Sequence, residues 1–206
     1  MVYILVPCKR LDDGKSRLSP CLDAVARRRF CQLLLMHTLQ QAAATVGALR
    51  VRLVTCDLDA IMIGTLYSVE TIFDRADGLN AALENARNSI ISNNVDIDQL
   101  LVLPIDLPFV STVAISMMMS CAGDVVLAPD ENGTGTNSIM LRSPAIRKFP
   151  FAFGPDSYAA HLEFARAHGL VVTTFHNSRL AFDVDVPQQY EDWSLRSSGE
   201  SGINSN

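Results

Sequence analysis

Residues 99–108 read QLLVLPIDLP and contain an unbroken apolar run, Leu100–Leu103, followed by an acid between two prolines. An apolar run without polar alternation is typical of a strand that is buried on both faces of a parallel sheet. We therefore predict a strand over Gln99–Pro104 near the centre of such a sheet. Asp106 would then be held rigidly just beyond the carboxyl end of that strand, because the flanking prolines restrict the backbone.

Outward from this strand, short apolar runs alternate with longer stretches of helical periodicity, which is the pattern of βαβ units. We predict an α/β fold with a mostly parallel central sheet flanked by helices. The other predicted strands are Val2–Pro7, Val51–Thr55, Val69–Phe73, Asp124–Ala128, Ser138–Arg142 and Leu170–Phe175. The predicted helices are Asp23–Thr45, Gly78–Ile91, Val113–Ser120, Asp156–His168 and Pro187–Leu195. The first helix is expected to bury Val25, Phe30, Leu33, Leu34 and Leu39.

The 206 residues suffice for one domain, which we expect over residues 1–195, followed by a polar, disordered tail over 196–206. The net charge of −5 and the lack of a lysine-rich block argue against a nucleic-acid partner. No apolar run has the length of a signal peptide core or a membrane span, so we expect a cytoplasmic protein without a membrane partner. Five cysteines without a CxxC pair are consistent with reduced thiols.

The first strand is followed by a basic loop. Residues 7–18 read PCKRLDDGKSRL and carry four cations, among them Lys9, Lys15 and Arg17, around one glycine. A triphosphate needs cations and a close approach of the backbone, which Gly14 permits. The spacing is not that of a Walker A loop. We interpret the loop as a candidate phosphate site, with an ordinary basic surface loop as the alternative.

Asp183 and Asp185 form a second acidic feature, in the stretch FDVDVP over residues 182–187. In an extended segment both side chains point to the same face, and two carboxylates so close repel each other unless a cation lies between them. Taken alone, the pair is more typical of a helix-capping turn. Taken with Asp106, it indicates a site for Mg²⁺, which prefers carboxylate oxygens in a rigid arrangement.

Two further turns are candidates for binding an anion. Residues 129–137, PDENGTGTN, place Thr134 and Thr136 in a glycine-rich turn whose backbone N–H groups could form a nest, with a plain hairpin turn as the alternative. In FGPDS, residues 153–157, Gly154 and Ser157 open a helix, and free N–H groups at a helix N-terminus bind phosphate. A simple helix cap remains the alternative there.

Taken in order, these motifs resemble the 2-phospho-L-lactate guanylyltransferases of coenzyme F420 biosynthesis. The stretches that carry the resemblance are VPCKRLDDGKSRLSP, DGLNAAL, LPIDLP, APDENGTGTN, FGPDSYAAH and FDVDVP, from residue 2 to about residue 187. The resemblance implies a nucleotidyltransferase fold similar to the glycosyltransferase-A type. It also implies transfer of GMP from GTP to the phosphate of a three-carbon phospho-acid with Mg²⁺, expected as two ions.

The resemblance also implies a role for each matching residue. Asp106, Asp183 and Asp185 correspond to the metal-binding aspartates. The other implied roles are catalysis for Lys15 and Arg17 with Asp106, acceptor binding for Thr134, Thr136, Gly154 and Ser157, and nucleotide binding for Lys9, Lys15, Arg17, Gly78, Leu79 and Asn80. Three positions depart from the family's pattern, namely Cys8, Val186 and Gln189.

Several points stay open at this stage. The acceptor could be 2-phospho-L-lactate, phosphoenolpyruvate or 3-phosphoglycerate, since all three are anionic three-carbon acids. No residue can be assigned to guanine. Rival interpretations are a molybdopterin or sugar nucleotidyltransferase of the same fold and a non-catalytic regulatory subunit. The expected partners are small molecules, and a homodimer is the assembly to be tested.

Overall fold

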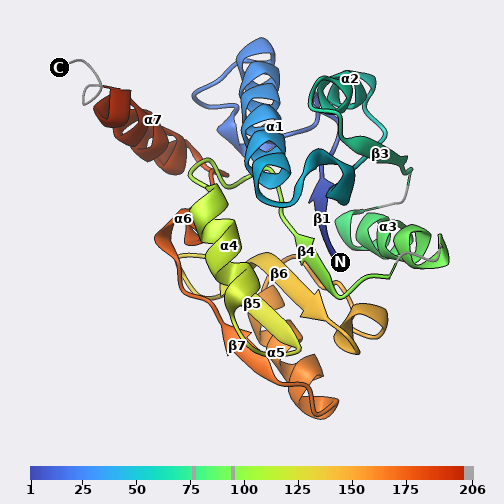
Figure 1. Cartoon of the computed structure of the whole chain (residues 1–206). Helices are drawn as coiled ribbons and strands as arrows, with labels where there is room; N and C mark the ends of the chain where they lie inside the picture. The colour runs from blue at the N-terminus through green and yellow to red at the C-terminus, as the bar shows by residue number, and fades with distance from the viewer. Residues whose placement is uncertain (76–77, 94–95, 202–206) are drawn as a thin grey trace.

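Seven strands form one sheet in the order β3-β2-β1-β4-β6-β5-β7, in a computed structural model that describes residues 1–75, 78–93 and 96–201 (Figure 1). The strands are β1 Val2–Pro7, β2 Val51–Thr55, β3 Glu70–Phe73, β4 Gln99–Val102, β5 Val125–Pro129, β6 Thr136–Arg142 and β7 Val172–Thr174. β6 pairs antiparallel with β4 and β5, and the other pairs are parallel. The predicted mostly parallel sheet is confirmed, with β4 at its centre.

The helices are α1 Ala24–Val46, α2 Leu58–Leu66, α3 Leu79–Ser92, α4 Thr112–Ser120, α5 Ser157–Ala167, α6 Ser178–Ala181 and α7 Pro187–Ser201. Short 3-10 turns lie at η1 Ser16–Leu18, η2 Ala48–Arg50 and η3 Ala145–Arg147. The sequence pattern did not predict α2 or α6. In the part of the chain that the structure describes, no helix combines the length and the apolar character needed to cross a membrane.

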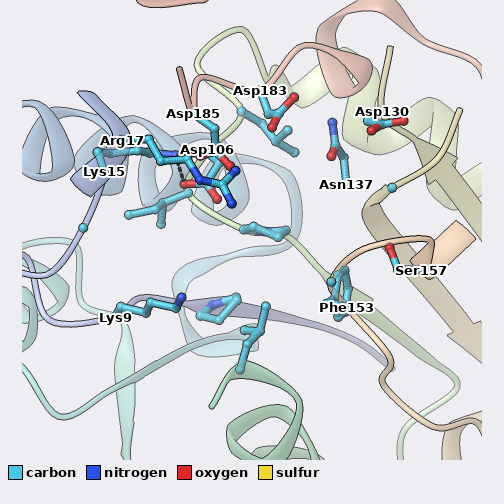
Figure 2. Close-up of a pocket in the computed structure, with 18 of the residues that line it drawn as sticks. Lys9, Lys15, Arg17, Asp106, Asp130, Asn137, Phe153, Ser157, Asp183 and Asp185 are labelled. Atoms are coloured by element: carbon cyan, nitrogen blue, oxygen red, sulfur yellow. Dashed lines mark hydrogen bonds and ion pairs between the residues drawn. The ribbon is translucent and has the colours of Figure 1, made fainter. Parts of the chain in front are cut away.

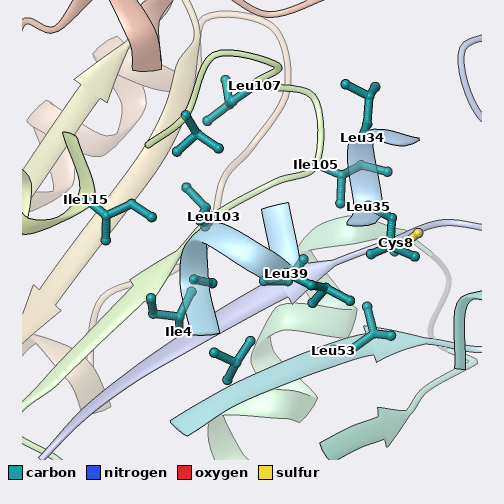
Figure 3. Packing of buried hydrophobic residues seen from close by; sticks show 14 of the residues in the cluster. Ile4, Cys8, Leu34, Leu35, Leu39, Leu53, Leu103, Ile105, Leu107 and Ile115 are labelled. Atoms are coloured by element: carbon teal, nitrogen blue, oxygen red, sulfur yellow. The ribbon is translucent and has the colours of Figure 1, made fainter. Parts of the chain in front are cut away.

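Helices cover both faces of the sheet, and each face has its own apolar core. Alternate residues of β1 point to opposite sides, because successive side chains of a strand do so. Ile4 packs with α1, α2 and α4 in one core (Figure 3), whereas Leu5 packs with α3 and α5 in the other. Burial on both faces explains the unbroken apolar run in β4, in which Leu100 and Leu101 are both fully buried.

Two expectations about the helices are wrong. Val25 and Leu33 of α1 are 59% and 57% exposed, because Cys31 and Leu35 occupy the buried face with Leu34 and Leu39. The expected disordered tail is wrong for residues 196–201, since α7 continues to Ser201. Tyr190 and Trp193 anchor this helix against Phe30 of α1, with ring centroids 5.2 Å and 4.8 Å away, and the helical ladder then continues past residue 195. Residues 202–206 lie outside the described residues.

Candidate active site

A cavity of about 960 Å³ opens at the carboxyl ends of β1 and β4 (Figure 2). From β1 the chain continues to β2 on one side, while β4 lies on the other side of β1. Ligands of open α/β sheets bind at such a reversal of strand order. The basic loop after β1, the acidic residues and the turns around Thr136 and Gly154 all line this one cavity.

A backbone hydrogen bond holds the two acidic segments together. The N–H of Val184 donates to the carbonyl oxygen of Asp106 at 3.1 Å, and the Val184 side chain is fully buried. Asp183 and Asp185 therefore face away from the core and line the cavity beside Asp106. Asn137 supports this arrangement, because its Nδ2 donates to two carbonyl oxygens at the end of α6, just before the acidic segment, at 3.0 Å and 2.9 Å.

Lys15 lies inside the acidic cluster rather than at the cavity mouth. Its Nζ forms ion pairs with Asp106 and, at 2.8 Å, with Asp185, and its side chain is only 5% exposed. Burial alone would lower the pKa of Lys15, but the two carboxylates raise it above the ordinary value. The ammonium group is therefore charged and neutralises two of the three aspartates. Lys9 and Arg17 also line the cavity, and neither has an ion-pair partner among the described residues.

The third aspartate, Asp183, forms no ion pair within the part of the chain that the structure describes. Burial, and then the negative charge of Asp185, raise the pKa of Asp183 to about 6. Among the described residues, no group of three His, Cys, Asp or Glu side chains converges as a metal site, and Lys15 lies between two of the candidate ligands. The donor chemistry nevertheless fits Mg²⁺, because three oxygen ligands with an uncompensated charge line one wall. Metal binding would require Lys15 to release at least one carboxylate.

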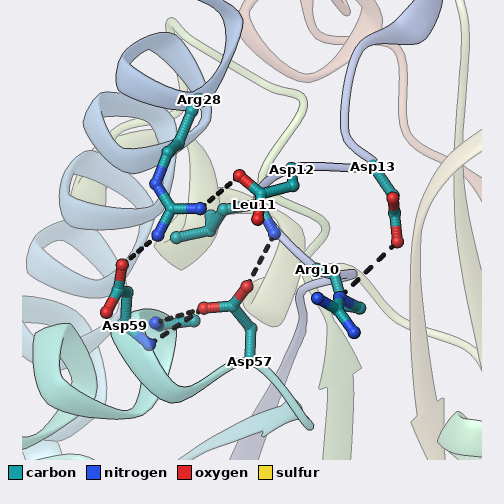
Figure 4. Close-up of polar contacts among 8 residues, drawn as sticks. Arg10, Leu11, Asp12, Asp13, Arg28, Asp57 and Asp59 are labelled. Carbon is teal, nitrogen blue, oxygen red and sulfur yellow. Dashed lines mark hydrogen bonds and ion pairs between the residues drawn. The ribbon is translucent and has the colours of Figure 1, made fainter. Parts of the chain in front are cut away.

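Asp57, which the sequence reasoning missed, holds the basic loop in place (Figure 4). It caps α2 by accepting the N–H of Asp59 at 2.9 Å, and its other oxygen accepts the N–H of Leu11 at 3.0 Å. Arg28 forms ion pairs with both Asp12 and Asp59, which ties the same loop to α1 and α2. An acid directly before an apolar helical run is an N-cap signal, and this signal could have revealed both α2 and the anchor.

Gly14 also has a packing role that the sequence did not predict. A Cβ atom at this position would lie 2.6 Å from Sγ of Cys31, so a larger residue would have to displace the Cys31 thiol for the loop to pack on α1. The following residue, Lys15, has a left-handed backbone with φ of 52°, which turns its side chain toward the acids. Gly14 packs against Cys31 and also lines the cavity, so its close approach to a phosphate stays a prediction.

The opposite wall carries hydroxyl groups and is organised by a buried histidine. The N–H of Thr136 donates to Oγ of Ser157 at 2.9 Å, and Thr136 Oγ1 lies 3.0 Å from Nδ1 of His161. Nε2 of His161 accepts the N–H of Ala152 at 3.0 Å, and burial lowers the pKa of His161 to about 4. The ring is therefore neutral, carries its hydrogen on Nδ1 and donates it to Thr136. Among the described residues no group accepts the hydroxyl hydrogens of Thr136 and Ser157, so both can be donated to an anion.

Gly154 and Thr134 differ in how well they suit an anion. Gly154 has φ of 142°, a backbone conformation that favours glycine, and it lines the cavity with open space around the position of a Cβ atom. The Thr134 hydroxyl instead lies 3.3 Å from Oδ2 of Asp130, which also accepts the Thr134 N–H through Oδ1 at 2.8 Å. Thr134 thus stabilises the turn, and Thr136 is the better placed hydroxyl.

Residues 2–204 match the family described as guanylyl transferase CofC like. The chain is 33% identical over 190 residues to the phosphoenolpyruvate guanylyltransferase of Rubrobacter xylanophilus, with 91% of this chain and 90% of that protein covered. The chain belongs to the CofC-like guanylyl transferase family. The phosphoenolpyruvate guanylyltransferase of Chloroflexus aurantiacus is 35% identical over 198 residues, covering 94% of each chain. The 2-phospho-L-lactate guanylyltransferase of Methanothermobacter thermautotrophicus is 28% identical over 198 residues, covering 95% and 85%.

Solved structures share the fold at low sequence identity. A nucleotidyl transferase from Methanothermobacter has a TM-score of 0.67 at 17% identity, covering 96% of this chain and 99% of that one. CMP:2-keto-3-deoxy-manno-octonic acid synthetase, solved in complex with CTP, has a TM-score of 0.65 at 14% identity, covering 97% and 99%. The predicted single-domain nucleotidyltransferase architecture is thereby confirmed.

Two departures from the CofC-like pattern have local explanations. Oε1 of Gln189 accepts the N–H groups of Asp185 and Val186, at 2.7 Å and 3.1 Å. Gln189 thus closes the start of α7 in the manner of a capping box, where glutamine and glutamate serve equally. Cys8 is buried at 5% exposure in the core beneath the loop, and burial raises the pKa of its thiol. It therefore acts as a small apolar side chain.

The segment of this CofC-like chain that was predicted to bind the nucleotide, residues 78–80, contributes to two pockets. Asn80 lines the large cavity, Gly78 lines a smaller pocket beside it, and Leu79 lines both. The Asn80 amide exchanges two hydrogen bonds with the backbone of Phe153, at 3.0 Å and 2.8 Å. Asn80 therefore joins the start of α3 to the turn that contains Gly154, and its side chain positions that turn.

Proposed function

We propose that this chain transfers the guanylyl group of GTP to the phosphate of a three-carbon phospho-acid, in coenzyme F420 biosynthesis, and releases pyrophosphate. One observation carries the proposal, namely that a cluster of three aspartates with Lys15 faces the hydroxyl wall of Thr136 and Ser157 across one cavity. The first wall suits a triphosphate with its metal, and the second suits a small anion. Family membership favours this function over a molybdopterin or sugar nucleotidyltransferase and over a non-catalytic subunit.

The chain's own residues would position charge rather than perform covalent chemistry. An oxygen of the acceptor phosphate attacks the α-phosphorus of GTP, and the bond to the β-phosphate breaks. Lys9 and Arg17, which have no acidic partner among the described residues, would neutralise the departing pyrophosphate, and Lys15 would join them after leaving Asp106. Mg²⁺ held by Asp106, Asp183 and Asp185 would supply further charge neutralisation. No general base is needed, because the acceptor phosphate is already ionised near neutral pH.

Phosphoenolpyruvate is the first acceptor to test. Its transferases from Rubrobacter and Chloroflexus are 33% and 35% identical to the chain, and the 2-phospho-L-lactate enzyme is 28% identical. Thr136 and Ser157 offer neutral donors, which bind a phosphate while leaving its oxygens nucleophilic. We place the reaction in the cytoplasm, where GTP is available, and the homodimer stays a prediction.

The direct test is pyrophosphate release with GTP, ATP and CTP, each combined with phosphoenolpyruvate, 2-phospho-L-lactate and 3-phosphoglycerate in the presence of Mg²⁺. We expect turnover with GTP and at least one acid, with GTP preferred over ATP by about tenfold or more. Removal of Mg²⁺ by a chelator should abolish the release. Mass spectrometry would identify the guanylyl diphospho-acid. No turnover in any combination would contradict the proposed function, and equal turnover with ATP would contradict its guanylyl part.

Ser157→Ala tests whether the hydroxyl wall of Thr136 and Ser157 binds the acceptor. The variant should raise the KM of the acceptor by about 5- to 150-fold, which corresponds to roughly 1–3 kcal/mol for a hydrogen bond to a charged group. The KM of GTP should change little. Ser138→Ala is the matched control, because the buried Ser138 hydroxyl donates to the Val102 carbonyl at 2.6 Å and does not line the cavity. It should lower the thermal stability without changing either KM. A change confined to the KM of GTP in Ser157→Ala would reverse the assignment of the two walls.

A further inference from the structure

A second, smaller pocket of about 240 Å³ adjoins the large cavity at the carboxyl ends of β1 and β2 and beside α3. The two hollows share lining residues, including Pro7, Lys9 and Leu79, so a single ligand can extend from one into the other. Apolar side chains of Val54, Leu79 and Ala82 form much of the smaller lining. A flat ring system suits such walls, whereas a triphosphate does not. The large cavity already supplies the cations that a triphosphate requires.

Asp74 brings a carboxylate to this apolar pocket. It follows β3, and its Oδ1 accepts a hydrogen bond from Nδ2 of Asn85 on α3 at 3.1 Å. Its Oδ2 is buried and has no hydrogen-bond partner among the described residues. Within the same part of the chain no lysine or arginine pairs with it, and the neighbouring Arg75 lies over the ring of Phe73 instead. A buried carboxylate oxygen without a partner is costly, so the missing donor requires an explanation.

The chemistry of a carboxylate indicates which ligand group would donate to Asp74. The edge of guanine presents two parallel donors, N1–H and the exocyclic amino group, and a carboxylate accepts two such hydrogen bonds at once. Adenine presents a nitrogen lone pair at the same edge, which a carboxylate repels. Each carboxylate oxygen has two lone pairs, so Oδ1 can keep its hydrogen bond from Asn85 while both oxygens of Asp74 accept from the base.

We propose that Asp74 reads the guanine base of GTP and that the smaller pocket holds this base. The inference rests on the proposed function, and it adds the specificity-determining residue that no sequence motif revealed. The base would lie against Leu79 and Ala82, and the phosphates would pass Lys9 toward Lys15 and Arg17. Beyond the phosphates lie first the acidic cluster and then the hydroxyl wall of Thr136 and Ser157. Transfer at the α-phosphorus requires the base, the phosphates and the acceptor to follow in this order.

Asp74→Asn is expected to change the nucleotide preference of the enzyme and not only to lower its activity. Xanthine carries a carbonyl oxygen in place of the guanine amino group, so an asparagine amide can donate to this oxygen and accept from N1–H. We expect the kcat/KM for GTP to fall by about 10- to 100-fold, and the ratio of GTP to XTP turnover to shift toward XTP by at least as much. Asp98→Asn is the matched control, because the Asp98 side chain is 72% exposed, pairs with the N-terminal amine and lines neither pocket. It should keep the wild-type ratio.

Two measurements keep the proposal testable if Asp74→Asn folds poorly or turnover fails. Wild-type protein should bind GTP more tightly than ITP, which lacks only the amino group, and more tightly than ATP, in equilibrium titrations that require no acceptor. An unchanged GTP-to-XTP ratio in a folded Asp74→Asn variant would overturn the role of Asp74, as would equal wild-type affinity for GTP, ITP and ATP. Wild-type protein that prefers GTP in titrations but turns over none of the three acids would contradict the proposed function while supporting the pocket.

Discussion

Asp106→Asn and Asp183→Asn are each expected to lower the rate of guanylyl transfer by about 10²-fold or more at saturating substrates, the scale of losing a key electrostatic partner. Asparagine preserves the size of the side chain and removes its charge, so packing around the acidic segments should survive. The hydrogen bond that joins these segments uses the backbone of Asp106 and Val184, and neither substitution removes it. The loss should therefore report on charge and metal binding.

The two variants should be assayed by pyrophosphate release over a titration of Mg²⁺, with thermal unfolding as a check of the fold. Asp98→Asn is the matched control, because Asp98 lies just before β4 and Asp106 just after it. The two residues are therefore at opposite ends of this strand. The Asp98 side chain is 72% exposed and pairs with the N-terminal amine. The control should retain the wild-type rate. Near-full activity of Asp106→Asn and Asp183→Asn in metal-buffered solution would show that these aspartates do not hold the metal.

Lys15→Met should have the second large effect, with opposite results for catalysis and for metal binding. The rate should fall by about 10²-fold, since the transition state loses a cation at the phosphates. The free protein should at the same time bind Mg²⁺ more tightly, because Asp106 and Asp185 lose the ammonium group that now pairs with both. Methionine has a similar length and no charge, so the burial of the side chain is retained.

Thermal unfolding with and without Mg²⁺ gives the readout for Lys15. The variant without metal should unfold at a lower temperature than the wild type, because three neighbouring carboxylates then repel one another. Mg²⁺ should raise its unfolding temperature more than it raises that of the wild type. Lys9→Met is the comparison, since Lys9 lies apart from the acidic cluster in the same cavity (Figure 2) and should leave the response to Mg²⁺ unchanged. An unchanged rate in Lys15→Met would show that this lysine has no role at the phosphates.

The sequence alone was sufficient for the features that depend on neighbouring residues. The unbroken apolar run of β4 predicted a strand buried on both faces, because side chains of a strand alternate between the two faces. The position of Asp106 at the end of that strand followed directly. The alternation of Asp183, Val184 and Asp185 was equally readable, and burial of Val184 leaves both acids on one face.

Short-range patterns failed where a distant segment decides the outcome. Leu33 is apolar and suits the helix, yet the position of α1 on the sheet leaves it exposed and buries Leu35 instead. Residues after Leu195 are polar and were expected to be disordered. The aromatic contacts of Tyr190 and Trp193 with Phe30 anchor α7, and a helix anchored by packing extends through residues that would not form one alone.

The electrostatic arrangement of the site belongs entirely to the tertiary structure. Lys15 was expected at the phosphates, and only the fold places it between Asp106 and Asp185, which lie 91 and 170 residues later in the chain. His161 closes the stretch FGPDSYAAH but was given no role there, and Asp74 lies in none of the quoted stretches. Their importance lies in a hydrogen bond to Thr136 and in an oxygen without a partner among the described residues. Residue type and spacing determine which groups are available and which face they occupy. Which charges meet depends on the order of strands in the sheet, and long-range packing sets that order.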